Sequence, residues 1–164
     1  MNKVKHSLFL FVILMVVWAL FTSVDGQEIL TGAIISLLIT LITIKAEPIL
    51  GHIKLTPKSF VYFLLYIVVF IKELIMSNID VARRVVDPKL PIKPGIVKVR
   101  TKLKSKLGKI ILANSITLTP GTMTTEIKDD YLYIHWIEIS HDDIEGATKE
   151  IVETFEKYLE VIFG

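Results

Sequence analysis

The residues of this sequence that could carry chemistry are few, and their types exclude most kinds of catalytic site. None of the 164 residues is a cysteine, which excludes cysteine nucleophiles, iron–sulfur clusters and cysteine zinc sites. The histidines lack the close spacing of a metal-binding pair; they are His6, His52, His135 and His141. No glycine-rich phosphate loop ending in GKS or GKT occurs. We therefore expect neither a cofactor nor a metal site, and no enzymatic activity.

A polar stripe follows an apolar stretch that runs from Phe60 to Ile71. Glu73, Ser77, Asp80 and Arg84 are spaced i, i+4, i+7 and i+11. On a helix that continues from the apolar stretch, this spacing places all four side chains on one face. We expect the stripe to contact neighbouring subunits or lipid headgroups.

Three ionisable residues could move or sense protons. Glu73 and its neighbour Lys72 qualify because ionisable groups at membrane depth are functional candidates by default. Adjacent helical residues point about 100° apart, and the pair lies where the helix leaves the apolar stretch. A structural or interfacial role is therefore favoured over proton conduction. His135 belongs to an alternating strand pattern, which favours a packed or half-exposed histidine over a pH sensor.

A conspicuous turn motif lies further along the chain, at Thr119-Pro120-Gly121-Thr122. Proline and glycine occupy the central positions of a type II turn, which requires a positive φ at the glycine. The flanking hydroxyls are placed to cap the preceding helix end and to bond the turn. Locally the motif is explained as a well-made turn, and a docking role for it is a hypothesis.

These residues are embedded in a chain whose first half is apolar. Hydrophobic residues make up 52% of the sequence and charged residues 22%. Ser7–Val24 and Gln27–Ile44 are long enough to cross a bilayer with little tilt. The intervening Val24–Gln27 is a turn, so the pair predicts a transmembrane helical hairpin. A signal peptide is the alternative for the first stretch, but no small-x-small cleavage site follows it.

The second apolar stretch carries small residues on one face. Gly32 and Ser36 lie four positions apart, a spacing that allows close helix contact in lipid. This pattern indicates a helix-packing seam, although small residues are also tolerated in lipid without any such role.

The distribution of Lys and Arg sets the orientation. The N-terminus is basic and the turn between the spans is acidic. The loop after the second span is again basic, with Lys45, Lys54 and Lys58 against Glu47. Residues 81–109 carry a net charge of +9, and residues 110–164 carry −8. We expect a multi-pass cell-membrane protein whose C-terminal part is cytoplasmic. Two crossings with an interfacial or partly inserted third helix are favoured over three crossings.

The sequence of the expected cytoplasmic part predicts a small βαββα domain. The expected order is a strand at 96–101, a helix at 104–114, a hairpin of strands at 123–128 and 131–138 around Asp129-Asp130, and a final helix that begins at Ser140, with Asp143 completing a capping box. Helices on one face of a small sheet are the simplest packing. The whole chain is therefore an α+β membrane protein. Its expected segments are the hairpin (1–58), the third helix (59–86), a proline-rich linker (87–95) and the domain (96–164).

The basic region from Arg83 to Lys109 could bind either of two kinds of anionic partner, lipid headgroups or nucleic acid, and we expect the first. Anionic lipid headgroups attract such segments with about 1 kcal/mol per charge. Nucleic acid is excluded, because the region follows a membrane anchor and has no interleaved aromatic residues.

Several of these segments together resemble a known family. The run Asn114-Ser115-Ile116-Thr117-Leu118-Thr119-Pro120-Gly121-Thr122, followed by Tyr133-Ile134-His135-Trp136, is similar to the E subunit of the multisubunit Na+/H+ antiporters. Lys72–Val81 and Pro94-Gly95-Ile96-Val97 match the same family, so the resemblance covers nearly the whole chain.

The resemblance implies a non-catalytic subunit of a cation/proton antiporter. It equally implies a subunit of an archaeal membrane-bound hydrogenase complex with an antiporter module. Its partners would be the other small and large antiporter-type subunits. The alternative is a stand-alone membrane-tethered module that binds or converts a small ligand.

Overall fold

The structure is a computed structural model that describes residues 3–23, 25–43, 54, 56–141 and 143–164, with side chains described from Ser7 onward. The chain divides into two units, Met1–His52 and Ile53–Gly164, and each is described by itself. Two charges used above for orientation, Lys45 and Glu47, lie outside the described residues.

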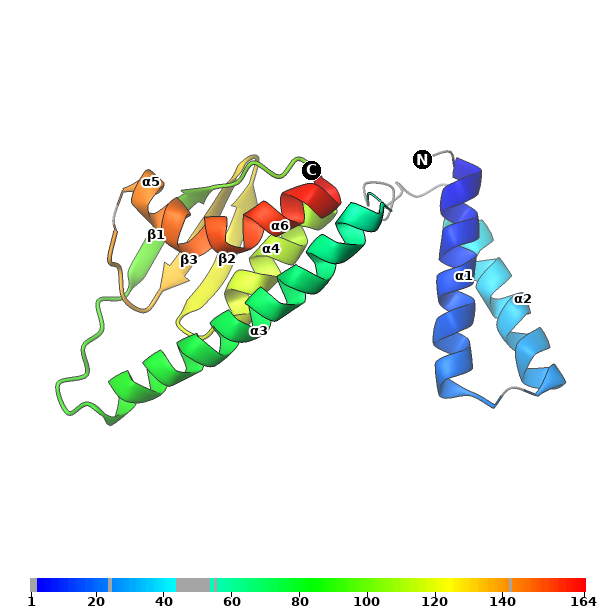
Figure 1. Ribbon diagram of the computed structural model, residues 1–164, viewed down its shortest axis with the longest axis horizontal. Coiled ribbons are helices and arrows are strands. Elements are labelled where there is room, and N and C mark those ends of the chain that lie inside the picture. Colours follow the sequence, from blue (N-terminus) through cyan, green and yellow to red (C-terminus); the bar gives the residue numbers. More distant parts are fainter. Residues whose placement is uncertain (1–2, 24, 44–53, 55, 142) are drawn as a thin grey trace. The chain divides into compact units, whose positions relative to one another are not determined.

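The N-terminal unit is a helical hairpin made of α1 (Lys3–Phe21) and α2 (Gly26–Thr43), shown in blue to cyan in Figure 1. Small residues of α2 face α1, since Gly32, Ser36 and Thr40 are its buried residues. A Cβ atom at Gly32 would lie 2.5 Å from a ring carbon of Trp18. The predicted packing seam is therefore confirmed, and glycine is required where the indole crosses α2.

Helix α3 (Pro57–Val86) begins three residues before the predicted apolar stretch. Thr56 caps it, accepting a hydrogen bond from the backbone N–H of Ser59 at 3.1 Å, and proline takes the first helical position. By length and composition alone, α2 and α3 could each cross a membrane, whereas the apolar part of α1, Ser7–Phe21, is shorter.

The sheet has three antiparallel strands, β1 (Gly95–Arg100), β2 (Thr122–Lys128) and β3 (Tyr131–Trp136), in the order β1-β3-β2. The predicted hairpin around Asp129-Asp130 is confirmed as the β2–β3 connection. Asp129 adopts a φ of 54° there, a conformation that aspartate tolerates better than most residues.

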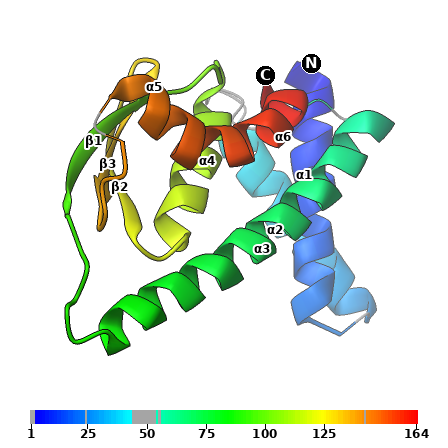
Figure 2. The ribbon, with the colours of Figure 1, turned by 60° about the vertical axis from the view of Figure 1, so that its left-hand side comes forward.

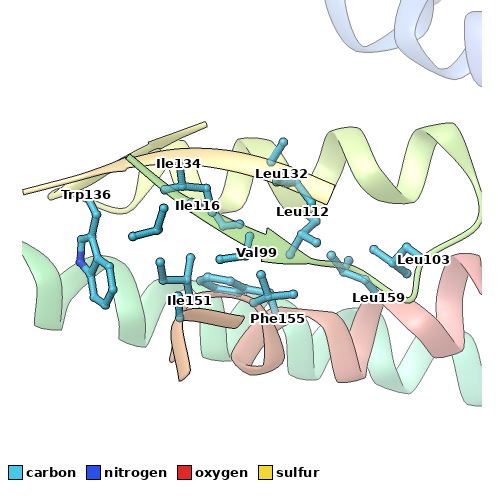
Figure 3. Close-up of a cluster of buried hydrophobic side chains, with 14 of the residues drawn as sticks. Val99, Leu103, Leu112, Ile116, Leu132, Ile134, Trp136, Ile151, Phe155 and Leu159 are labelled. Carbon is cyan, nitrogen blue, oxygen red and sulfur yellow. The ribbon is translucent and has the colours of Figure 1, made fainter. Parts of the chain in front are cut away.

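One face of the sheet carries the core. Its side chains come from alternate positions of β1 and β3 and meet apolar residues of the helices (Figure 3); they are Val97, Val99, Leu132, Ile134 and Trp136. The two-residue period sends their neighbours to the opposite face, where Ile96 and His135 are exposed in register with each other. The expected packing of helices on one face is thus observed.

Helix α4 (Lys106–Leu118) is longer than predicted. Ser105 caps its start by accepting from the N–H of Gly108 at 3.0 Å. The polar residues near its end, predicted to lie outside the helix, remain helical because their hydroxyls bond back to it. Ser115 Oγ donates to the Ile111 carbonyl at 2.7 Å, and Thr117 Oγ1 donates to the Ala113 carbonyl at 2.8 Å.

The final helix differs from the prediction at its start. It begins with α5 (Ile144–Ala147), and the cap is Asp143, which accepts from the N–H of Gly146 at 2.7 Å. The prediction of Ser140 as the cap is wrong. Its hydroxyl instead donates to Glu150 Oε2 at 2.8 Å, so the capping role passes to the next suitable acceptor.

A π-helical turn, η2 (Thr148–Val152), connects α5 to α6 (Glu153–Phe163). A π turn accommodates one more residue than an α turn and so shifts the phase of the helix. The buried residues on both sides of this turn include Ile151, Val152, Phe155 and Glu156.

Helix α3 packs mainly on α6, on the side of that helix away from the sheet (Figures 1 and 2). The ring of Tyr62 lies 6.2 Å from that of Tyr158, and the ring of Phe70 lies 6.3 Å from that of Phe155. Between these contacts, the Tyr66 hydroxyl is 2.5 Å from Ser115 Oγ on α4. The third helix is therefore part of the packed C-terminal unit.

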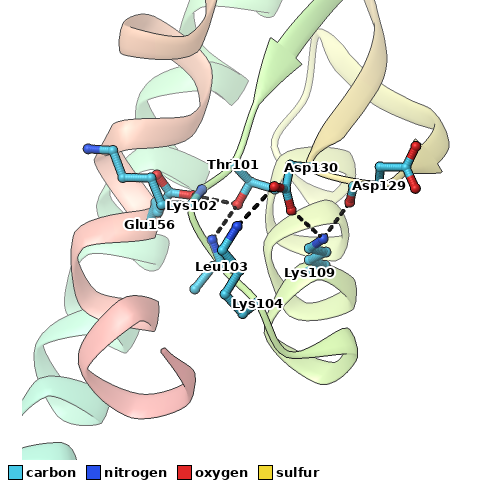
Figure 4. A network of polar contacts seen from close by, with 8 residues as sticks. All are labelled: Thr101, Lys102, Leu103, Lys104, Lys109, Asp129, Asp130 and Glu156. Carbon is cyan, nitrogen blue, oxygen red and sulfur yellow. Dashed lines mark hydrogen bonds and ion pairs between the residues drawn. The ribbon is translucent and has the colours of Figure 1, made fainter.

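A buried carboxylate fastens the chain that leaves β1 (Figure 4). Glu156 is only 4% exposed, and its Oε1 accepts from Thr101 Oγ1 at 2.5 Å and from the Lys102 N–H at 2.8 Å. The Thr101 hydroxyl in turn accepts from the N–H of Leu103 at 3.2 Å. The β1–α4 connection is thus held by α6.

A partly exposed ion cluster joins the hairpin turn to the same connection and to α4 (Figure 4). Asp130 is 2.9 Å from Lys104 Nζ and 3.0 Å from Lys109 Nζ. These hydrogen bonds, that of Lys104 first and that of Lys109 second, lower the pKa of Asp130 from 3.8 to about 2. Lys109 also donates to the carbonyl of Asp129.

Candidate functional site

A groove of about 440 Å³ lies beside the C-terminal half of α3, within the C-terminal unit. One wall is α3, the second is the α4–β2 turn, and the third is formed by the chain after β3 together with η2 and the start of α6. We call it the α3 groove. Its lining residues are Glu73, Ser77, Asp80, Val81, Arg84, Ile116, Thr119–Thr122, Trp136–Glu138, Ser140, Glu150, Ile151, Thr154 and Phe155.

The polar stripe predicted from sequence forms the α3 wall of the groove. All four of its members, Glu73, Ser77, Asp80 and Arg84, line it. Ser77 is internally bonded, since its hydroxyl donates to the Glu73 carbonyl at 2.7 Å. The three ionisable members therefore supply the charge of this wall.

The predicted turn, Thr119–Thr122, forms the second wall. Gly121 has a φ of 95° and the Thr122 N–H donates to the Thr119 carbonyl at 3.3 Å, as the Pro-Gly pattern predicts for a type II turn. Both hydroxyls bond the end of α4: Thr119 Oγ1 donates to the Ser115 carbonyl at 2.7 Å and Thr122 Oγ1 to the Ile116 carbonyl at 2.7 Å. The turn is therefore rigidly fastened to the helix before it.

Gly121 is also a close neighbour of two groove side chains. A Cβ atom at this position would lie 3.1 Å from a methyl carbon of Ile137 and 3.6 Å from one of Val81. A larger residue would press on both the third wall and α3.

Arg84 bridges the groove. Its Nε lies 2.7 Å from Asp80 Oδ2, and its Nη1 forms an ion pair with Glu138 and donates to the Pro91 carbonyl at 2.9 Å. The guanidinium thus joins α3 to the chain after β3 and to the linker before β1. Its charge is shared by two carboxylates.

Two other carboxylates line the groove away from Arg84. Glu73 Oε1 is 3.3 Å from the ammonium of Lys72, which is largely exposed. Glu150 accepts from the Ser140 hydroxyl and lies 3.6 Å from His141 Nε2. The lining residues therefore carry four acids and one arginine, a net charge of −3 with neutral histidine.

The remaining sequence candidates lie elsewhere. Asn114 is exposed on α4, and Thr117 accepts from the N–H of Thr124 at 3.1 Å, which ties α4 to β2. His135 is exposed on the open face of the sheet. None of these three residues is part of the groove lining.

Sequence reasoning missed the third wall. Glu138 and Glu150 belong to no motif, and both line the groove because η2 lies beside the chain that follows β3, where the Ser140 hydroxyl donates to Glu150. Within the ranges that the structure describes, no three His, Asp or Glu residues are placed to hold a metal ion. The acids of the groove therefore act as an extended charged surface.

The basic region is not one surface. Lys104 and Lys109 face Asp130, and Arg84 faces the groove. The ammonium of Lys98 lies 3.9 Å from the ring centre of Tyr131 on the open face of the sheet. Bases that are adjacent in sequence thus point to different parts of the unit.

Comparison with known proteins identifies the family. A family model described as "Na+/H+ ion antiporter subunit" matches residues 11–162. The chain belongs to this family. The resemblance to the E subunit of these antiporters, which the sequence motifs indicate, is thereby confirmed.

Two relatives illustrate how far the similarity extends. The E subunit of the Na(+)/H(+) antiporter of Alkalihalophilus pseudofirmus is 47% identical over 90 residues, which is 54% of this chain and 56% of that protein. The E1 subunit of the Na(+)/H(+) antiporter of Staphylococcus saprophyticus is 35% identical over 153 residues, covering 92% of this chain and 89% of that protein. This chain therefore spans little more than half of the first relative and nearly all of the second.

A solved structure supports the architecture of this family member. A chain of the membrane-bound sulfane sulfur reductase, described as an archaeal respiratory membrane complex, superimposes with a TM-score of 0.83 and 45% identity. The match covers 96% of this chain and 99% of that chain. The α+β organisation, with apolar helices and a small antiparallel sheet, is thus shared with a chain of a membrane complex.

Proposed function

We propose that the chain is a non-catalytic membrane subunit of a multisubunit cation/proton antiporter, or of the antiporter-like module of an archaeal respiratory complex. Its role would be assembly and coupling of ion translocation. The observation that carries the proposal is the match of residues 11–162 to the antiporter-subunit family, and the near-complete similarity to a chain of an archaeal respiratory membrane complex, at 45% identity, supports it. Other subunits would move the sodium ion and the proton that appear in the family's name, because neither α1 nor α2 carries a series of ionisable side chains along its length.

The membrane topology is the second part of the proposal. At 1.5 Å per residue, α2 is about 27 Å long, close to a hydrocarbon core of about 30 Å, whereas the apolar part of α1, Ser7–Phe21, is about 22 Å long and needs its flanking residues to complete a crossing. The two helices would cross as a hairpin, with residues 95–164 in the cytoplasm.

Helix α3 is long enough to cross too, but its packing argues against a crossing. Contacts to the C-terminal unit extend from Ser59, whose hydroxyl donates to the Val161 carbonyl at 3.4 Å, to Arg84. A crossing α3 would carry the unit into the bilayer with it. Charged residues that α6 exposes, such as Glu153 and Lys157, would then enter hydrocarbon at a cost of several kcal/mol each.

The opposite face of α3 suits the membrane surface. It exposes a continuous set of large apolar side chains: Phe60, Val61, Phe63, Leu64, Ile67, Val68, Ile71, Ile75 and Ile79. A helix with one apolar face can lie in the plane of the interface, with that face immersed among the acyl chains. We therefore propose two crossings and an in-plane α3.

Basic side chains flank the two ends of this helix. Lys54 and Lys58 lie at its beginning, and Arg83, Lys89 and Lys93 lie at its end and in the following linker; all five are exposed. In an in-plane arrangement they would reach anionic headgroups at both ends of α3.

Recovery of the complex tests the subunit role. An affinity-tagged chain, expressed from its own genomic locus, should co-purify in mild detergent with large antiporter-type membrane subunits. Deletion of the chain should abolish cation-driven proton exchange in vesicles, and the tagged chain should restore it. Purification of the tagged chain alone, with exchange unaffected by deletion, would favour a stand-alone membrane-tethered module.

Cysteine labelling tests the topology in a chain that has no cysteine of its own. Lys149→Cys, at an exposed position of η2, should react with a membrane-impermeant thiol reagent only in inverted vesicles. Gln27→Cys, at the exposed start of α2, is the matched control and should react only in intact cells. Reaction of both positions from the same side would contradict the hairpin arrangement.

A further inference from the structure

We propose that the α3 groove receives a Lys/Arg-rich cytoplasmic loop from a neighbouring membrane subunit of the same complex. The inference rests on the proposed function, since it requires a multisubunit assembly. It adds a docking site on this chain and the chemistry of the segment that occupies it.

Uneven packing along α3 produces the groove. The N-terminal half of the helix is in close contact with the unit through the rings of Tyr62 and Phe70. The C-terminal half is held to it chiefly by Arg84, and the groove of about 440 Å³ remains beside it. The groove can therefore admit a peptide segment without separation of α3 from the unit.

The charge of the lining defines the occupant. Arg84 is engaged by Asp80 and Glu138, which leaves one negative charge there, and the other two net negative charges of the lining belong to Glu73 and Glu150. Glu73 and Glu150 lie on opposite walls, one on α3 and one on η2. The largely exposed ammonium of Lys72, 3.3 Å from Glu73, offsets part of this charge, whereas Ser140 beside Glu150 carries none. The lining, with three net negative charges, therefore still attracts an approaching cation.

A neighbouring membrane subunit supplies the complementary charge. Cytoplasmic loops of membrane proteins carry an excess of Lys and Arg close to the ends of their helices. A groove beside an in-plane α3 lies at the depth where such loops emerge. Electrostatic complementarity of this kind fixes orientation and register during assembly.

Lipid headgroups are the less suitable occupants. Anionic headgroups would be repelled by the acids of the lining, and the proposed lipid-facing side of α3 is the side opposite the groove. The apolar lining, which includes Ile116, Trp136 and Phe155, suits the aliphatic stems of Lys and Arg.

Site-specific photo-cross-linking in the full chain tests the docking site. Benzoylphenylalanine replaces Ser140, an exposed lining residue, and membranes are irradiated before the complex is purified. We expect mass spectrometry to identify a cytoplasmic loop of a co-purified multi-pass subunit, with Lys or Arg next to the cross-linked residue. The same probe at Glu153, exposed outside the groove lining, is the control and should not yield that peptide.

Charge removal tests the electrostatic part. Glu73→Gln combined with Glu150→Gln should lower the cross-link yield about fivefold to tenfold, and added salt should lower it in the parent chain. The matched control, Glu153→Gln with Glu160→Gln, removes two exposed carboxylates outside the groove lining and should leave the yield unchanged.

The outcomes separate the docking site from the subunit role. A recovered complex whose Ser140 cross-links reach only lipid, this chain itself or an apolar transmembrane segment would refute the docking site and leave the subunit role standing. Equal yields from the two double variants would refute the electrostatic argument. Failure to recover any antiporter-type partner would overturn the proposed function, and the docking site with it.

Discussion

Replacement of Glu156 by alanine should loosen the C-terminal unit through the connection between β1 and α4. Its carboxylate is 4% exposed and receives two hydrogen bonds, from Thr101 Oγ1 and from the Lys102 N–H. Hydrogen bonds to a charged acceptor contribute about 1.5–3 kcal/mol each. Thr101 is only 1% exposed, so water cannot replace the lost partner of its hydroxyl. The Lys102 N–H is partly buried and can be solvated at lower cost. We therefore expect Glu156→Ala to destabilise this unit by about 3 kcal/mol.

Two matched variants distinguish the contribution of the Glu156 carboxylate from a general effect of substitution in α6. Glu156→Gln keeps an acceptor oxygen in place but removes the charge, so we expect a loss of about 1–2 kcal/mol. Glu153→Ala removes an exposed carboxylate one turn earlier on α6, and it should change stability by less than about 0.5 kcal/mol.

Hydrogen exchange followed by mass spectrometry, on the full chain in detergent, measures the effect locally. A change of about 3 kcal/mol corresponds to roughly a hundredfold faster exchange for amides of β1 and β3 that open with the unit. Peptides of α1 and α2 should be unaffected and serve as the internal control. Unchanged exchange in β1, or equal effects of Glu156→Ala and Glu153→Ala, would refute the assignment of Glu156 as a buried clamp.

Three other single positions give measurable expectations. Gly121→Val introduces a branched side chain at a φ of 95°, which should cost about 1–3 kcal/mol locally. Hydrogen exchange of amides at the start of β2 should accelerate, and recovery of the complex should fall. Unchanged recovery would show that the turn has only a local structural role. Asp130→Asn should lower stability near pH 5, because the pKa of Asp130 is depressed to about 2 in the folded chain. The ionised Asp130 stabilises the folded chain fully above the unfolded pKa of about 4, and this contribution is lost as the pH falls through about 2. The melting temperatures of the variant and the parent should therefore converge as the pH is lowered over that range. A difference in melting temperature that stays constant with pH would contradict this assignment. Gly32→Leu should separate α1 from α2, because a Cβ atom there would overlap the ring of Trp18; disulfide cross-linking between cysteines introduced across the hairpin should fall, and retained cross-linking would refute the seam.

Local chemistry made much of the fold predictable. Pro120-Gly121 and Asp129-Asp130 both form the expected reverse turns, because proline, glycine and aspartate favour particular φ values regardless of the surroundings. The strand–helix–hairpin–helix order follows from hydrophobic periodicity alone.

Helix ends were less predictable, because several side chains compete for each capping position. Ser140 and Asp143 are both good caps, and in the folded chain Asp143 caps the helix while the Ser140 hydroxyl donates to Glu150. Likewise, Ser115 and Thr117 extend α4 because their hydroxyls find helix carbonyls. The π turn in η2 was not predicted either, because its residues fit the helical pattern of the segments on both sides of it.

Local sequence patterns were enough to predict the two paired apolar helices and the seam of small residues between them. They also predicted the order of elements in the C-terminal unit and the polar stripe on α3. Tertiary packing was needed to bring the stripe and the Thr119–Thr122 turn to the same groove and to complete it with Glu138 and Glu150. Packing also places α3 along the unit through Tyr62, Tyr66 and Phe70. These contacts join residues many positions apart, so they arise from the packing of helices on the sheet and leave no periodic pattern in the sequence.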